Sequence, residues 1–158
     1  MTEIQPRRFA AARQEPFVLF LIGMRINAVW KVHKWLPVFR TMPRMLRELA
    51  MQPELGYLGG HAWFGRTIIL VQYWTSFEAL EAYANARNHA HLPAWAAFNR
   101  NIGSDGTVGI WHETYEIPAG GYECVYANMP RFGLGKVSGV VPAHGIMSAA
   151  RSRLRRPG

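Results

Sequence analysis

The stretch YLGGHAWFGRTIILVQYW, residues 57–74, is where the fold of this chain is easiest to predict. It holds two runs rich in aromatic and β-branched residues, 57–64 and 67–74, on either side of the short turn Gly65-Arg66. Residues of these types favour the pleated surface of a sheet, and two such runs around a short turn containing glycine predict a β-hairpin.

Two more strands are predicted, one before and one after this hairpin. Residues 17–27 form an almost continuous apolar run, which suits a strand buried on both faces. Residues 108–117, VGIWHETYEI, again combine aromatic with β-branched side chains. Residues 122–128 are predicted to form a fifth strand, after the turn that begins at Pro118.

Helices are predicted between these strands. A helix over residues 33–51 places four apolar side chains on its inner face, namely Met42, Met45, Leu46 and Leu49. Ser76 is a suitable N-cap for a helix that begins SFEALEAYANA, and Pro93 can start a further helical piece, AWAAFNRNI.

The element order is therefore β-α-β-β-α-β with one extra strand, the α+β arrangement called ferredoxin-like. Its helices cover one face of an antiparallel sheet. Because several strands are apolar on both sides, a second copy of the chain is the simplest cover for the other face, and we expect a homodimer. The predicted domain spans residues 16–134, between a basic arm, 1–15, and an irregular basic tail, 135–158.

Composition narrows the class of protein. The chain has 158 residues, the usual size of one domain, and 49% of them are hydrophobic. A single cysteine, Cys124, excludes an intrachain disulfide and fits a reducing cytoplasm, where we expect the protein.

No signal peptide is visible, and the apolar residues 17–26 are too few to span a bilayer, so no integral membrane segment is expected.

The formal net charge of +8 is concentrated in arginines near both ends of the chain. Such ends can contact nucleic acid or anionic lipid, but no nucleic-acid-binding motif is present, and we expect solvated termini without a nucleic-acid partner. Residues 29–46 mix bases with aromatics. An amphipathic helix covering the sheet is the preferred interpretation of that segment, with a membrane-surface helix as the alternative.

His112 and Glu113 are two ionisable side chains in the middle of a predicted strand. Successive strand residues point to opposite faces, so the pair cannot act on one substrate, and each needs its own partner if it is buried. Either group can be structural, through a hydrogen bond to a neighbouring strand or loop, or functional.

A ligand pocket in this architecture is expected between the sheet and its helices. A few polar groups set among aromatics are typical of a site for a lipophilic small molecule. The candidate catalytic residues are His112, Asn99 and Trp95. The candidate substrate-binding residues are Arg25, His61, Trp63, Trp74 and Phe98. Gln72 lies two positions before Trp74 on the same predicted strand, so both side chains point to the same face.

The sequence contains two partial matches to metal-binding and phosphate-binding motifs, and neither is complete. HETYE has Glu116 where the zinc motif HExxH requires histidine, and it lies on a predicted strand. Gly133-Leu-Gly-Lys has Pro130 and Val137 where a phosphate-binding loop requires glycine and a hydroxyl residue. No metal site is therefore expected.

Four blocks resemble a known family over residues 17–134. They are LIGMRINAVWKVHKWLPVFRTMPRML, HLPAWAAFNRNIG, VGIWHETYEI and YECVYANMPRFGLG. The family is the bacterial and fungal DUF4188, also described as fumagillin-cluster monooxygenase-like, within the dimeric α/β barrel superfamily. The resemblance implies this fold. The superfamily holds cofactor-free antibiotic-biosynthesis monooxygenases and haem enzymes such as aldoxime dehydratases and chlorite dismutases.

Three functions follow as hypotheses. A cofactor-free monooxygenase needs a base that forms the substrate anion, for which His112 is the candidate, and hydrogen-bond donors that hold the anion, for which Asn99 and Trp95 are candidates. A haem enzyme would use His91 or His112 as the axial ligand. A non-catalytic dimer that binds a lipophilic ligand would need the aromatic residues alone.

Overall fold

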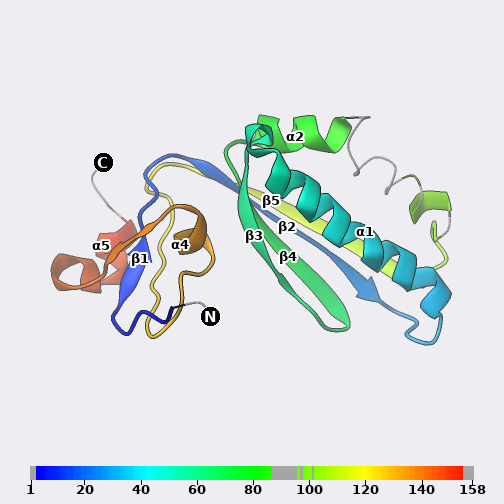
Figure 1. Ribbon diagram of the computed structural model, residues 1–158, viewed down its shortest axis with the longest axis horizontal. Coiled ribbons are helices and arrows are strands. Elements are labelled where there is room, and N and C mark those ends of the chain that lie inside the picture. The colour runs from blue at the N-terminus through cyan, green and yellow to red at the C-terminus, as the bar shows by residue number, and fades with distance from the viewer. Residues whose placement is uncertain (1–2, 87–95, 97, 101, 155–158) are drawn as a thin grey trace.

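The computed structural model describes residues 3–86, 96, 98–100 and 102–154, and its main body is a four-stranded antiparallel sheet (Figure 1). The strands are β2 (Phe17–Ile26), β3 (Tyr57–Trp63), β4 (Thr67–Trp74) and β5 (Val108–Ile117), in the spatial order β3-β4-β2-β5. The ferredoxin-like α+β fold expected from the sequence is confirmed, with β4 and β5 at the predicted bounds.

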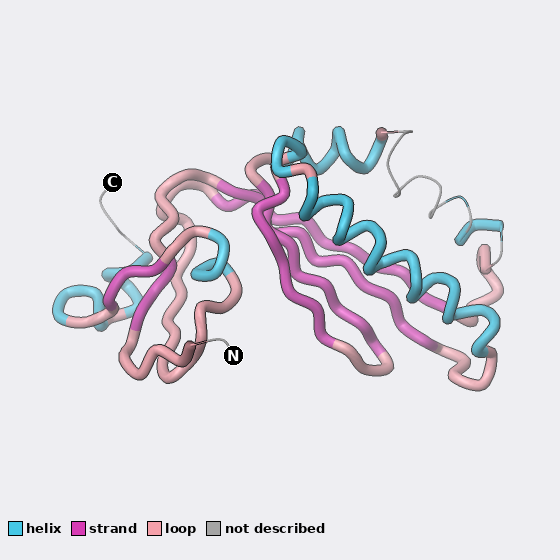
Figure 2. The backbone as a smooth tube through the Cα atoms, viewed as in Figure 1, coloured by secondary structure: helices cyan, strands magenta, loops and turns pink. Residues whose placement is uncertain are grey.

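Two helices lie on one face of this sheet, as Figure 2 also shows. Helix α1 (Val32–Met51) is followed by a short 3₁₀ turn, η1 (Pro53–Leu55), and α2 (Phe77–Asn85) follows β4. Ser76 caps α2 as predicted: its Oγ accepts a hydrogen bond from the backbone N–H of Ala79 at 3.2 Å.

The hydrophobic core lies between the helices and the face of the sheet that they cover, which we call the helix-covered face. One cluster joins the helices to one end of the sheet through Val18, Leu49, Trp74, Leu80 and Tyr83. A second cluster lies at the other end, where Phe98 and Ile102 pack on Met24, Ile26 and Val108. Burial of these side chains fixes the register of β2, since a slip by one residue would expose them.

Among the described residues, the opposite face of the sheet, which we call the open face, is covered by Phe132 beside β3 and by a cluster at one end. There Leu19 and Tyr73 pack beside Leu134. Farther along, the side chains of Leu21, Val71 and Trp111 remain partly exposed. This face carries the apolar surface that led us to expect a second copy of the chain.

The two ends of the chain meet in a small second unit, the terminal module, formed by residues 5–11 and 122–154 (Figure 1). Strand β1 (Phe9–Ala11) pairs with β6 (Val140–Pro142), and α4 (Leu134–Val137), the 3₁₀ turn η2 (Gly145–Ser148) and α5 (Ala150–Leu154) complete it.

Two sequence expectations are wrong in this module. Residues 135–158 are not irregular throughout, because Val140–Pro142 form β6, which pairs with the buried residues Phe9, Ala10 and Ala11. Residues 122–128 do not join the main sheet as a fifth strand, and they contribute only a single bridge, from Tyr126 to Phe9. The rings of Tyr126 and Phe9 stack 5.1 Å apart, so this segment packs against the N-terminal strand.

Arg153 ties the C-terminal helix into this module. Its side chain is buried; Nε donates to Glu123 Oε1 at 2.6 Å, and Nη1 donates to the carbonyls of Met147 and Ser148 at 2.8 and 2.7 Å. The basic tail is therefore folded here, at least as far as Leu154.

Arg153→Ala is expected to destabilise the protein by about 1.5–3 kcal/mol, the usual cost of losing hydrogen bonds between charged groups. A urea melt measures the free energy of unfolding, and hydrogen exchange should show faster exchange in β1 and β6. Arg151→Ala is the matched control, because Arg151 is exposed on the same helix. Equal stability of the two variants would mean that α5 does not dock through Arg153.

Within the described residues, no helix combines the length and the hydrophobicity that are needed to cross a membrane.

Candidate functional site

A small cavity lies on the helix-covered face, where the sequence predicts the ligand pocket. Its volume is about 40 Å³. The lining comes from β2 (Phe20, Ile22), α1 (Met42, Met45, Leu46, Leu49), β4 (Gln72, Trp74) and α2 (Leu80, Tyr83, Ala84). The predicted inner face of α1 is confirmed, since all four of its expected side chains line this cavity.

The few polar groups in this lining are held by hydrogen bonds. Gln72 is buried, and its Oε1 accepts a bond from Trp74 Nε1 at 2.8 Å. The Tyr83 hydroxyl donates to Glu48 Oε2 at 3.2 Å. Burial and the nearby Glu48 carboxylate raise the pKa of the Tyr83 phenol, so this group stays protonated at neutral pH. The cavity therefore offers an amide and a neutral phenol among apolar side chains.

His112 lies beside this cavity on the same face. Its strand position is directly opposite Ile22, and its ring lies 5.8 Å from the ring of Phe20, centroid to centroid. Both Ile22 and Phe20 line the cavity. The imidazole itself is exposed on β5, an edge strand of the sheet. The imidazole is therefore accessible from solvent beside the cavity.

Glu113 points to the open face, as strand parity predicts. It pairs with Leu21, and its Oε2 accepts a hydrogen bond from the Tyr115 hydroxyl at 2.7 Å. That bond and the carboxylate charge raise the pKa of the Tyr115 phenol. The prediction that His112 and Glu113 cannot share a site is confirmed. Neither His112 nor Glu113 is a buried charge, because both side chains are exposed.

The structure divides the predicted substrate-binding residues between the two faces. Trp74 is fully buried in the cavity wall, and Phe98 lies in the second core cluster, at the other end of the helix-covered face. Arg25, His61 and Trp63 lie on the open face, so the prediction that they line the same pocket is wrong.

The contacts of these three residues are accordingly remote from the cavity. Arg25 Nη1 donates to Thr67 Oγ1 at 2.9 Å. The ring of His61 lies 4.7 Å from that of Trp63 and 4.6 Å from that of Phe132, centroid to centroid, in an aromatic cluster on the open face. His61 and Trp63 were assigned to the wrong face because the register of β3 shifts between Tyr57 and Gly59.

The remaining candidates are less well placed. Asn99 is exposed on the segment that carries Phe98. Trp95 and His91 lie outside the described residues. Sequence reasoning missed the pair of Tyr83 and Glu48; their signal was a tyrosine three positions after Leu80 on the inner face of α2.

The described residues give little support for a metal or haem in this site. They contain no group of three or more His, Cys, Asp or Glu side chains that could hold a metal ion. The described lining of the cavity includes no imidazole or thiol. Its volume of about 40 Å³ is also far below the roughly 300–1,000 Å³ of pockets for drug-sized ligands. Among the described lining residues there is therefore no histidine or cysteine to act as axial ligand of a haem, and His91 lies outside the described residues.

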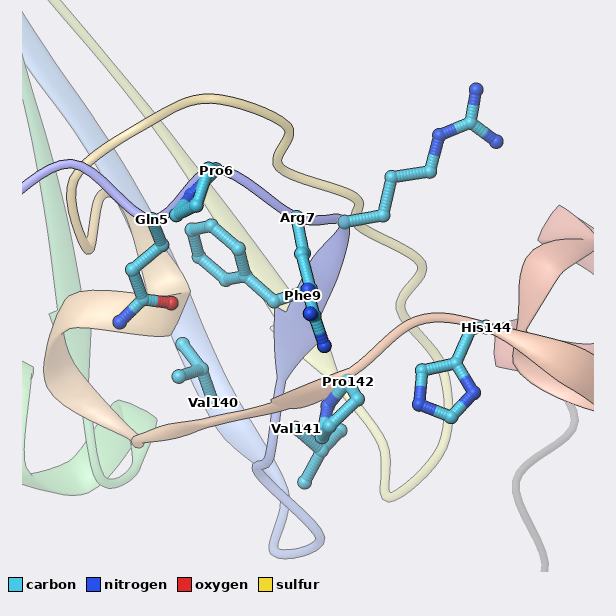
Figure 3. Close-up of a pocket in the computed structure, with 9 residues that line it drawn as sticks. Gln5, Pro6, Arg7, Phe9, Val140, Val141, Pro142 and His144 are labelled. Atoms are coloured by element: carbon cyan, nitrogen blue, oxygen red, sulfur yellow. The ribbon is translucent and has the colours of Figure 1, made fainter.

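A larger cavity, of about 350 Å³, lies in the terminal module (Figure 3). Phe9, Val140 and Val141 are among its apolar lining, and Arg7 and His144 are among its polar lining. Its lining residues, 5–9, 140–142 and 144, belong neither to the four-stranded sheet nor to its helices. We therefore place the candidate site at the smaller cavity, which adjoins His112.

Comparison with solved structures shows the same fold in longer proteins. A crystal structure of aldoxime dehydratase matches with a TM-score of 0.67 and 18% identity, over 90% of this chain and 46% of that chain. An aldoxime dehydratase in complex with butyraldoxime matches with a TM-score of 0.63 and 14% identity, over 82% of this chain and 42% of that chain. At these identities the likeness concerns the fold alone.

Comparison of sequences identifies the family. Monooxygenase af470 of Aspergillus fumigatus is 30% identical in an alignment of 132 positions that covers 75% of this chain and 45% of that protein. The chain thus spans less than half the length of this relative. The family model described as Monooxygenase af470-like matches residues 17–134, from the start of β2 to the start of α4. The chain therefore belongs to the Monooxygenase af470-like family.

Proposed function

We propose that the protein is a monooxygenase-like oxidoreductase that acts on a lipophilic, electron-rich small molecule on the helix-covered face. The observation that carries this proposal is the apolar cavity with buried Gln72 in its wall, joined through Phe20 and Ile22 to the exposed imidazole of His112. Membership of the Monooxygenase af470-like family supports the reaction class.

The chemistry follows from what dioxygen requires. A substrate that is oxidised without a cofactor must itself supply the electrons, so it must form an electron-rich anion, such as a phenolate or enolate. In this proposal His112 is the general base that takes the proton. One oxygen atom then replaces two hydrogens of a substrate CH₂ group to give a carbonyl, and the other oxygen leaves as water.

The size of the cavity decides how such a substrate lies. A volume of about 40 Å³ admits only a small part of it, so the reacting end remains at the β5 edge, near His112. Met42 and Met45 line the cavity, and methionine side chains adapt readily to new shapes. Their movement enlarges the cavity around the apolar end of the ligand.

Oxygen uptake with a panel of electron-rich phenols and enols tests the proposal. With isotopically labelled dioxygen, we expect one labelled atom in the product and one in water, with one dioxygen consumed per product. Saturable ligand binding with no oxygen uptake above the uncatalysed rate would overturn the proposal and favour a non-catalytic binding dimer. A Soret band in the purified protein would instead favour the haem enzyme.

The same proposal includes a homodimer that packs open face against open face. The partly exposed apolar residues of that face support it, and a stable interface should bury on the order of 1,600 Å². Val71 lies in the middle of this face, opposite Leu21 and His61.

Val71→Asp should convert the dimer to a monomer, because it places a charge in the centre of an apolar interface. Light scattering at micromolar concentration measures the mass. Ala82→Asp is the matched control, since it adds the same charge on the exposed side of α2. A wild-type monomer, or a Val71→Asp dimer, would contradict this arrangement.

A further inference from the structure

Three loops meet at the end of the sheet that lies away from the terminal module (Figure 1). They are residues 27–31 after β2, 64–66 between β3 and β4, and 103–107 before β5. Arg66 Nε donates to the carbonyl of Ile26 at 3.2 Å, and the backbone N–H of Asn27 donates to the carbonyl of Thr107 at 3.0 Å. These bonds make the three loops one continuous surface, which we call the loop surface.

Large apolar side chains project from the loop surface into solvent. Trp30 is 79% exposed and Phe64 is 72% exposed, and Val29 and Val32 are 51% and 46% exposed. The first loop is held in place, because Trp35 Nε1 donates to the carbonyl of Val29 at 3.0 Å. Single exposed apolar residues are common, but several on one ordered surface mark a site of interaction.

Basic side chains surround these apolar groups. Arg25, Lys31, Lys34 and Arg66 lie on the loop surface or directly beside it. Among the described residues of 25–34, 63–67 and 98–107, Asp105 is the only acid, and its Oδ2 lies 3.3 Å from Lys34 Nζ. The loop surface therefore combines exposed aromatic residues with a net positive charge.

Exposed aromatic residues together with a net positive charge favour some binding partners of the loop surface over others. A second copy of the chain would bring two positive surfaces together, which like-charge repulsion opposes. An anionic bilayer satisfies both features, since tryptophan inserts at the level of the headgroups while lysine and arginine meet the lipid phosphates. We propose that the loop surface docks the protein on anionic lipid membranes, with Trp30 and Phe64 inserted among the headgroups.

This docking goes beyond the proposed function and does not depend on it. If the proposed function holds, docking brings the enzyme to the phase in which a lipophilic substrate concentrates. The test therefore measures membrane binding without turnover, so that failure of either proposal is seen separately.

Co-sedimentation of the full chain with phosphatidylcholine vesicles, with and without phosphatidylserine, tests the docking. We expect binding to the anionic vesicles only, weakened by salt. Trp30→Ser should lower the affinity by about tenfold or more, as loss of a buried aromatic group implies. Lys31→Gln should lower it about fivefold, as loss of one positive charge near the lipid implies.

Matched controls lie on the terminal module, away from the loop surface. Ile146→Ser removes an apolar side chain that is 86% exposed, and Arg151→Gln removes an exposed base. Neither control should change vesicle binding. The proposal is overturned if the wild-type chain does not bind anionic vesicles, or if the controls lower binding as much as the loop variants. A change of oligomeric state in Trp30→Ser without vesicle binding would instead identify the loop surface as a protein interface.

Discussion

His112→Ala should lower turnover by about a hundredfold or more, because a general base contributes roughly 10²–10⁴ to the rate. The fold should tolerate the change. Among the described residues, the imidazole contacts the ring of Phe20, and the side chain is exposed. Exposed substitutions usually change the free energy of unfolding by less than about 0.5 kcal/mol. Loss of activity at an unchanged melting temperature is therefore the expected result.

Glu113→Gln is the matched comparison for His112→Ala. The residue is adjacent in sequence and also exposed, but it points to the open face. The amide keeps the shape and an oxygen for the Tyr115 hydroxyl, so we expect near-normal turnover and an effect on stability or dimerisation only. A thermal melt and an oxygen-uptake assay on both variants decide the matter. Equal loss of turnover in both, at unchanged melting temperature, would contradict the assignment of the site to one face.

The sheet could be predicted because its strands carry strong local signals. Strands β4 and β5 begin and end at the predicted residues, since each is a run of aromatic and β-branched side chains between turn residues. The start of α2 was equally clear, because Ser76 is a polar cap before an apolar helix. In these elements, local preference and tertiary packing agree.

The terminal module could not be predicted because its pairing is distant and short. Three residues, Phe9–Ala11, pair with Val140–Pro142 from the far end of the chain. A three-residue strand has too few positions to show an alternating pattern. Arg153 was assigned to a solvated tail because an arginine is almost never buried without a partner, and its partner, Glu123, is thirty positions earlier in the sequence.

The candidate site was predicted in part, and two of the failures, His61 and Trp63, have a common cause. On a regular strand, neighbouring side chains point to opposite faces of the sheet. For this reason His112 and Glu113 were assigned correctly to different faces. In β3, Tyr57 pairs with Trp74 and faces the helices, but Gly59 pairs with Tyr73 on the open face. The intervening irregularity carries His61 and Trp63 to the open face with Gly59. Gly59 has a φ of +141°, which a glycine adopts readily.

Gly23 is the position where we expect a single methyl group to do the most damage to the fold. It lies in the middle of β2, with Trp111 as its cross-strand neighbour on the open face. A Cβ at Gly23 would overlap the backbone carbonyl of Ile68 and would lie 2.7 Å from Nε1 of Trp111. The carbonyl belongs to the paired strand β4, so it cannot move without disturbing the ladder between the two strands.

Gly23→Ala should therefore destabilise the protein by about 3 kcal/mol, the upper end of the usual cost of overpacking. Gly109→Ala is the matched control. Gly109 pairs with Arg25 on the same face, and its Cβ would meet Asn27 Nδ2 at 3.7 Å and Arg25 Cβ at 3.8 Å, which are ordinary contacts. Since glycine weakens a strand, the control should be neutral or slightly stabilising. Urea melts of both variants measure the difference. Equal stability would mean that Trp111 and β4 shift freely, and that the open face is not the rigid surface a sheet-to-sheet dimer requires.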